Sequence, residues 1–121
     1  MLQTILLIFL GGGLGSLARF GISLGVKQFS ETTFPVATLI SNVLSCVVIG
    51  ITLSFLAGKL QDKNLYMFIV VGFCGGFSTF STFSLETLEL FRRGQIMIGT
   101  ANVIVSVALC LMVLAFLVKK I

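Results

Sequence analysis

Four long apolar stretches constrain this chain more than any other feature of its sequence. They cover approximately residues 2–26, 35–56, 65–91 and 96–118. Each exceeds the ~20 residues that a helix needs to cross a hydrocarbon core about 30 Å thick. We therefore predict an all-α integral membrane protein with four transmembrane helices, forming a single multi-pass domain over residues 1–121.

The composition agrees with lipid as the solvent. Hydrophobic residues make up 57% of the chain and charged residues 10%, too few to cover a surface that faces water. The eight Lys and Arg residues are scattered and form no basic patch, so we expect no nucleic-acid partner. There is no histidine, the commonest general base and metal ligand, and we expect the protein not to be an enzyme.

The short connections carry nearly all the charge, and they hardly favour one orientation in the membrane. Four crossings place both termini and the second connection on one face, and the other two connections on the opposite face. The basic residues of these faces are Lys59, Lys63, Lys119 and Lys120 on the first, and Lys27, Arg92 and Arg93 on the second. Such a small bias predicts insertion both ways, because Lys and Arg set the orientation of a helical protein.

Insertion both ways makes an antiparallel homodimer available. Because four short helices leave little room between them, any pore must use such an oligomer.

Small residues recur four positions apart along the first stretch. Three pairs have this spacing: Gly11 and Gly15, Gly12 and Ser16, and Gly21 and Gly25. Small residues at this spacing let helix backbones approach closely in lipid. Packing within the chain and a contact between two copies fit the pattern equally well.

The third stretch contains a poor continuous helix. Gly75 and Gly76 precede five hydroxyl side chains in seven positions. Glycine lowers helix propensity by ~1 kcal/mol, and hydroxyls compete for backbone hydrogen bonds. We predict a break near residues 75–79. Irregular backbone at membrane depth survives where protein buries it or where it lines a polar cavity, so its freed carbonyls are candidate cation ligands.

Downstream of the break, Phe80 and Phe83 lie three residues apart and share one helix face, with Phe77 in line if helical geometry continues. An aromatic stripe at this spacing is usually core. Ring edges carry positive quadrupole charge, however, and neighbouring hydroxyls donate hydrogen bonds. The segment could therefore face an anion.

Polar residues also form stripes on the second and fourth stretches. Thr38, Asn42 and Ser45 follow one another at spacings of four and three. The amide of Asn42 could replace part of an anion's hydration shell, or could make an interhelical hydrogen bond worth ~0.6 kcal/mol. Asn102 and Ser106 invite the same two interpretations, and there we favour the interhelical bond.

Two charged residues lie within or beside the stretches. Arg19 is inside the first, where an arginine near a helix centre costs roughly 2.5–3.5 kcal/mol on insertion. Glu86, in the third stretch, is its natural partner or its neighbour in a vestibule. Alternatively, Arg19 reaches the nearer interface along its own stem.

Three ordered motifs closely resemble those of the Fluc (CrcB) family of fluoride ion channels. GGGLGSLARF, at residues 11–20, is similar to the family's GGxxGAxxRY, and PVATLISN, at 35–42, is similar to PxGTLxxN. GFCGGFSTFSTFSLE, at 72–86, is similar to GFCGGxTTFSTFxxE. Ser16, Phe20, Ala37 and Ser78 depart from the family residues. The fourth stretch adds little to the resemblance.

The resemblance implies a dual-topology antiparallel homodimer in a bacterial inner or plasma membrane. It would conduct fluoride passively through two pores and so lower cytoplasmic fluoride. On matching positions it implies that Phe80, Phe83 and Asn42 contact the ion, with Ser81 and Thr82 on a polar track beside them. It implies vestibule roles for three residues, Arg19, Thr38 and Glu86. It also implies a structural Na+, held between the subunits by the backbone carbonyls of Gly75 and Ser78. Because main-chain oxygens would hold the ion, serine in place of the family's threonine at position 78 should affect the site little.

Three rival functions remain. A proton-coupled exporter of the small multidrug type also has four helices, but needs a buried carboxylate in the first helix, where this chain has Arg19. A structural or assembly subunit would pass no ion. An intramembrane serine hydrolase lacks a histidine or mid-span lysine to activate its serine.

Overall fold

The computed structural model describes residues 1–29, 31–56 and 62–118. All regular structure in these ranges is helical, and four helical stretches are long and apolar enough to cross a membrane: Leu2–Phe29, Val36–Phe55, Lys63–Arg92 and Ile96–Leu117. This confirms the prediction of an all-helical multi-pass membrane protein. Of the basic residues used above to judge orientation, Lys59, Lys119 and Lys120 lie outside the described residues.

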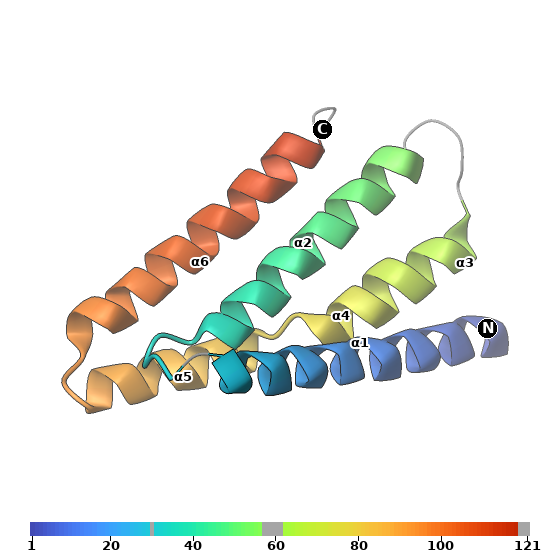
Figure 1. The fold of residues 1–121 in the computed structure, drawn as a ribbon. Helices are drawn as coiled ribbons and strands as arrows, with labels where there is room; N and C mark the ends of the chain where they lie inside the picture. The colour runs from blue at the N-terminus through green and yellow to red at the C-terminus, as the bar shows by residue number, and fades with distance from the viewer. Residues whose placement is uncertain (30, 57–61, 119–121) are drawn as a thin grey trace.

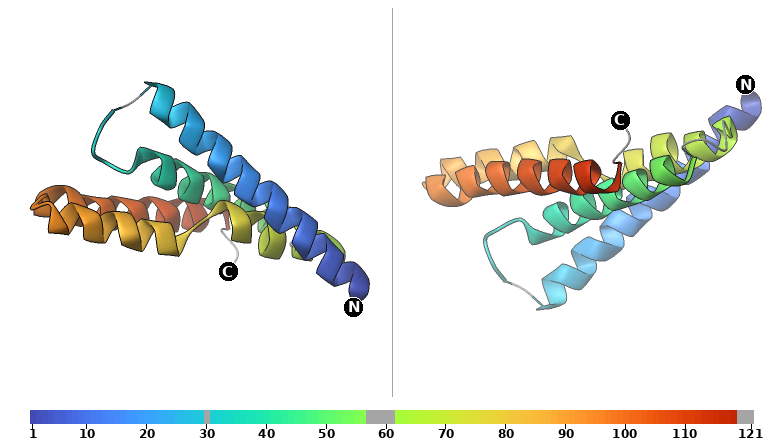
Figure 2. Two further views of the ribbon diagram at one scale, coloured as in Figure 1. Left: turned by 90° about the horizontal axis from the view of Figure 1, so that it is seen from below. Right: turned by 90° about the horizontal axis from the view of Figure 1, so that it is seen from above.

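Three spans are single helices and the third is composite. The single helices are α1 (Leu2–Phe29), α2 (Val36–Leu56) and α6 (Ile96–Leu117), and α1 runs on past the end predicted near residue 26. The third span consists of α3 (Lys63–Tyr66), the π-helix η1 (Met67–Cys74), α4 (Gly75–Phe77) and α5 (Phe80–Arg92). Its first half lies along α1, whereas α5 lies along α6 (Figures 1 and 2).

The third span leaves the helical conformation at Ser78 and Thr79. Their φ and ψ angles are −83° and 157°, and −152° and 116°, so both residues are extended. Gly75 and Gly76, at the start of the range in which the sequence predicted a break, are helical. We call Ser78 and Thr79 the extended pair. The π-helix that precedes α4 was not predicted.

Glycines bring α1 into backbone contact with the third span. A Cβ on Gly15 would overlap the carbonyl oxygen of Phe73, and one on Gly76 would overlap that of Gly12. In lipid, helices associate through van der Waals packing at such close contacts, because no water is released from apolar surfaces there. Gly11 and Gly15 therefore pack within the chain. For this pair the structure favours packing within the chain over contact between two copies, the two alternatives that the sequence left open. A Cβ at Gly21 or Gly25 would meet nothing within 4 Å.

A tight turn sends the chain from α5 back along α6. Gly94 has a φ of 79°, the left-handed conformation that glycine adopts without strain. The amide of Gln95 donates to Leu90 O at 2.9 Å and that of Gly94 to Phe91 O at 3.1 Å, the Schellman pattern of a helix end. This turn lies at the opposite end of the molecule from the N-terminus (Figure 1).

Candidate functional site

The amide of Asn42 holds the extended pair. Its Oδ1 accepts a hydrogen bond from the Thr79 backbone amide at 2.8 Å, and its Nδ2 donates to the Thr79 carbonyl at 3.4 Å. Two extended residues inside a membrane span would otherwise leave backbone groups without partners, which lipid cannot supply. A side chain of α2 thus replaces the helical hydrogen bonds that the third span loses here. One of the two interpretations of Asn42, the interhelical hydrogen bond, is confirmed.

Arg19 also bonds the backbone of the third span. Its Nε donates to the carbonyl oxygen of Gly76 at 3.2 Å. The prediction that Glu86 would be its partner is wrong, since no ion pair joins the two among the described residues. The reason is position, because Arg19 faces α4 whereas Glu86 lies six residues into α5, beyond the extended pair. A backbone carbonyl at membrane depth is enough to satisfy one donor of the guanidinium.

Hydroxyl groups complete the hydrogen bonding on both sides of the extended pair. Cys74 O accepts from Ser45 Oγ at 3.2 Å and from Ser78 Oγ at 2.7 Å. Thr79 caps the N-terminus of α5, its Oγ1 accepting from the Thr82 amide at 3.1 Å and lying 3.3 Å from Ser81 Oγ. The role of Thr79 was missed, although threonine before a helix is a recognised cap signal.

Phe80 and Phe83 stand together in the first turn of α5. Their ring centroids are 5.8 Å apart with the planes tilted by 45°. Phe83 is buried, whereas the side chain of Phe80 is 80% exposed. Asn42, through Thr79, joins α2 to the same helix end. The positive end of the α5 dipole, the residue that Asn42 bonds and the two aromatic rings thus all belong to the first turn of α5 and its cap.

Phe77 does not continue this stripe, although the sequence left that open. Its ring packs against Phe73 at a centroid distance of 5.4 Å and is buried. The cause is the extended pair, which separates the helical register of α4 from that of α5. Two pairs of rings result, one on each side of the break in helical structure.

The carbonyls of Gly75 and Ser78 have both lost their helical donors. In a continuous helix the amide of residue i+4 would donate to each. Here the Thr79 amide donates to Asn42 Oδ1 and the Thr82 amide to Thr79 Oγ1. Gly75 is exposed, and nothing lies within 4 Å of where its Cβ would be. Main-chain oxygens without donors are the kind of ligand that a hard cation takes.

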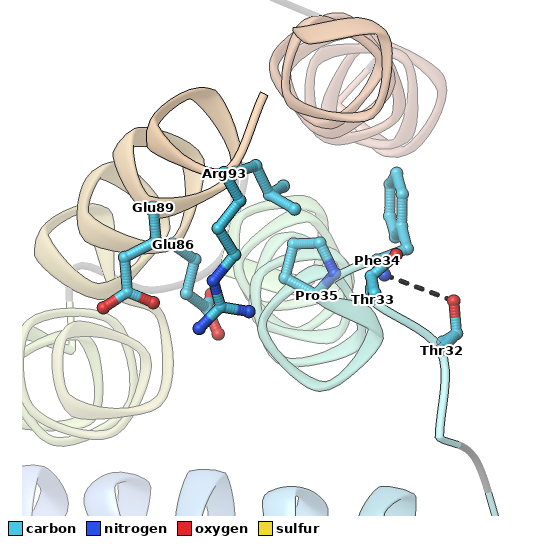
Figure 3. A pocket seen from close by; sticks show the side chains of 8 residues that line it. Thr32, Thr33, Phe34, Pro35, Glu86, Glu89 and Arg93 are labelled. Carbon is cyan, nitrogen blue, oxygen red and sulfur yellow. Dashed lines mark hydrogen bonds between the residues drawn. The ribbon is translucent and has the colours of Figure 1, made fainter. Parts of the chain in front are cut away.

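Glu86 lines a pocket of about 200 Å³ near the α5–α6 turn (Figure 3). Its lining residues are Thr32, Thr33, Phe34, Pro35, Glu86, Glu89, Leu90 and Arg93. The buried Glu86 Oε1 has no hydrogen-bond partner within the described ranges. Charged side chains gather here from the last turns of α5, as Figure 3 shows. Arg19 is not among them.

Comparison with known proteins assigns this chain to a family. The family model described as "CrcB-like protein, Camphor Resistance (CrcB)" matches residues 6–118. The chain belongs to the CrcB family. It is 43% identical to a fluoride-specific ion channel of Ruminiclostridium cellulolyticum, over 84% of this chain and 78% of the relative. A fluoride-specific ion channel of Flavobacterium psychrophilum is 39% identical over 92% of this chain and 90% of that protein.

The CrcB match extends through α6, where the motifs taken from the sequence gave little guidance. Asn102 is almost fully buried and donates to Thr87 Oγ1 at 2.9 Å, which confirms the interhelical bond that we favoured. Thr87 itself was not singled out. The signal that could have found it is its spacing of four from Phe83, to whose carbonyl its hydroxyl donates. Thr38, the remaining predicted residue, is buried in α2.

Proposed function

We propose that this protein is a passive fluoride-selective channel that lowers cytoplasmic fluoride. The observation that carries the proposal is the junction of Asn42 with the start of α5, beside the tilted rings of Phe80 and Phe83. The relatives that are named fluoride-specific ion channels agree with it. A neutral amide, hydroxyls and ring edges can take over a fluoride ion's hydration shell, and none of them carries the full charge that would trap it.

Each of these groups would make a different contact with the ion along this pathway. The amide of Asn42 has a second N–H besides the one that bonds Thr79, and it is free to donate to an anion. Ser81 and Thr82 offer hydroxyls one and two residues after Phe80, close to the positive end of the helix dipole. Ring edges of Phe80 and Phe83 complete the shell. Vestibule roles fall to Arg19, Thr38 and Glu86, and in that role the charge of Arg19 attracts anions.

We further propose that two copies assemble antiparallel, inserted in opposite directions, with two pores between them. The support is the exposure of Phe80: a ring that is 80% exposed in the single chain cannot line a narrow path without a second surface. An antiparallel pair uses one self-complementary surface twice, so it makes two equivalent paths.

The same arrangement offers a sodium site. The carbonyls of Gly75 and Ser78 would hold the ion, with the equivalent carbonyls of the second copy, and the bound charge would join the two copies. We expect the thermal midpoint of the purified protein to be higher in sodium chloride than in choline chloride of equal ionic strength, because binding to the folded state stabilises it. Equal midpoints, measured by circular dichroism in detergent, would argue against this site.

Fluoride efflux from liposomes tests the function. Purified protein is reconstituted into vesicles loaded with potassium fluoride, and an electrode records fluoride release after valinomycin is added. We expect release down the gradient, at a rate that an imposed pH gradient does not change. Dependence on the pH gradient would point to a proton-coupled carrier. Release no faster than from protein-free vesicles would indicate a structural subunit.

Asn42→Asp is expected to reduce fluoride efflux at least tenfold. The carboxylate can still accept from the Thr79 amide but cannot donate to the Thr79 carbonyl, and its charge repels an anion by about 1.4 kcal/mol or more at short range. Asn64→Asp is the matched control, since it makes the same change at an exposed residue of α3. Unchanged efflux from liposomes carrying Asn42→Asp would remove Asn42 from the pathway.

A further inference from the structure

α5 is held within the chain chiefly by α6. Its buried side carries Phe83, Thr87 and Leu90. Gly99 of α6 lies against the ring of Phe91, where a Cβ would come within 2.6 Å of a ring carbon. The two contacts, Phe91 with Gly99 and Thr87 with Asn102, run in antiparallel register and fix how far α5 can slide along α6.

A directed chain of hydrogen bonds crosses the seam between these two helices. Ser106 Oγ donates to Asn102 Oδ1 at 3.2 Å, and Asn102 Nδ2 donates to Thr87 Oγ1 at 2.9 Å. Thr87 Oγ1 then donates to the carbonyl oxygen of Phe83 at 2.7 Å. The exposures of Asn102, Ser106 and Thr87 are 1%, 5% and 7%. Bonds that point the same way in a dry seam polarise one another, so the chain is stronger than its separate members.

The end of this chain is the residue whose ring the proposed pathway uses. Phe80 and Phe83 belong to the same helix, so a small rotation of α5 about its axis moves both rings together. Within the single chain the far side of α5 makes few contacts, because Phe80, Ser81, Ser84 and Leu85 are exposed. Asn42 holds the start of α5 through Thr79, and the polar seam is the directional contact that bears on the rotation of α5 further along the helix, at Thr87.

We propose that Asn102 is a positioning residue for the ion pathway: acting through the Thr87 hydroxyl, it fixes the rotation of α5 and so the placement of the Phe83 ring. The inference rests on the proposed function, in which Phe83 lines the path. Apolar side chains of similar size would also hold α5 against α6, but without a directional bond they would not select one rotation.

Two substitutions at one position separate the hydroxyl from the packing. Thr87→Val keeps the shape and removes the hydrogen bonds, whereas Thr87→Ser keeps the hydroxyl and loses a methyl group. We expect fluoride efflux from liposomes to fall about fivefold in Thr87→Val and to stay near the wild-type rate in Thr87→Ser. The reverse order, with serine slower than valine, would show that packing alone matters and would overturn the inference.

The double variant Thr87→Val with Asn102→Leu tests whether positioning is distinct from stability. Replacing both partners of the Thr87–Asn102 bond by apolar groups leaves neither of these two unsatisfied and can be nearly neutral for stability. The Ser106 hydroxyl, which loses Asn102 Oδ1, can donate to a backbone carbonyl of its own helix, as serine hydroxyls in helices do. We therefore expect a near wild-type thermal midpoint with efflux still reduced about fivefold. Wild-type efflux from this double variant would overturn the inference and leave the proposed function intact. Absence of efflux from the wild-type protein itself would instead refute the proposed function.

Discussion

Gly15→Ala is expected to destabilise the folded protein by roughly 1–3 kcal/mol, the usual cost of overpacking. Gly15 is buried where α1 crosses the third span, and its Cα faces main-chain atoms. An added Cβ would overlap the carbonyl oxygen of Phe73 and lie 2.8 Å from the amide nitrogen of Phe77. Backbone atoms cannot turn aside as a flexible side chain would, so the helices must separate.

Gly13→Ala is the matched control for this prediction. Gly13 lies two residues earlier in α1, on the other side of the helix, and nothing is within 4 Å of where its Cβ would be. Alanine there should be neutral or slightly stabilising, because it has the higher helix propensity. Thermal unfolding followed by circular dichroism compares the two variants. Similar midpoints for Gly15→Ala, Gly13→Ala and the wild type would show that α1 does not depend on this close contact.

The same helix shows why the spans could be predicted from the sequence. Length and hydropathy decide whether a segment crosses a bilayer, and both are properties of the sequence alone. Hence four spans were predicted, and four were found in the part of the chain that the structure describes. The glycine spacing in α1 predicted a close backbone contact but not its partner, since Gly11 and Gly15 would serve a second copy as well as the third span.

Partners between helices were harder to predict. Charge suggested Glu86 as one possible partner of Arg19, but the guanidinium donates to the backbone carbonyl of Gly76 instead. That carbonyl is invisible to residue-type reasoning, because every residue carries one. Asn42 was recognised as part of a polar stripe, yet its bonds to Thr79 depend on how α2 meets the extended pair. Side-chain chemistry could be read from the sequence, whereas backbone groups freed by an irregular turn could not.

The π-helical stretch of η1 is a further feature that the sequence did not predict. Residues 67–74 are apolar and would suit an α-helix equally well, since composition does not distinguish i to i+4 from i to i+5 bonding. Its position just before Gly75 shifts the angular placement of everything that follows. The rotation of α5, and with it the face that carries Phe80 and Phe83, therefore follows from three-dimensional packing and not from counting residues.

Phe80→Ile and Phe83→Ile are each expected to reduce fluoride efflux from liposomes by a hundredfold or more. Isoleucine keeps an apolar side chain but has no ring edge with positive quadrupole charge. The partly dehydrated ion would then meet hydrocarbon where it had a donor. Removing one donor from a preorganised set costs an anionic species about 2.7–4 kcal/mol in well-studied enzymes, which corresponds to such a factor. The fluoride electrode measures the rates directly.

These variants distinguish a loss of folding from a loss of ion passage, because Phe80 is exposed whereas Phe83 is buried. Phe80 is 80% exposed, so Phe80→Ile removes little packing within the chain, and its thermal midpoint should stay near that of the wild type. Phe9→Ile, at a residue of α1 that is 75% exposed, makes the same chemical change far from α5 and should leave efflux unchanged. Equal efflux from Phe80→Ile, Phe83→Ile and Phe9→Ile would remove the rings from the pathway. A loss confined to the α5 variants requires the ion to pass these two rings, because the control shares the loss of an aromatic side chain but not its place in the fold.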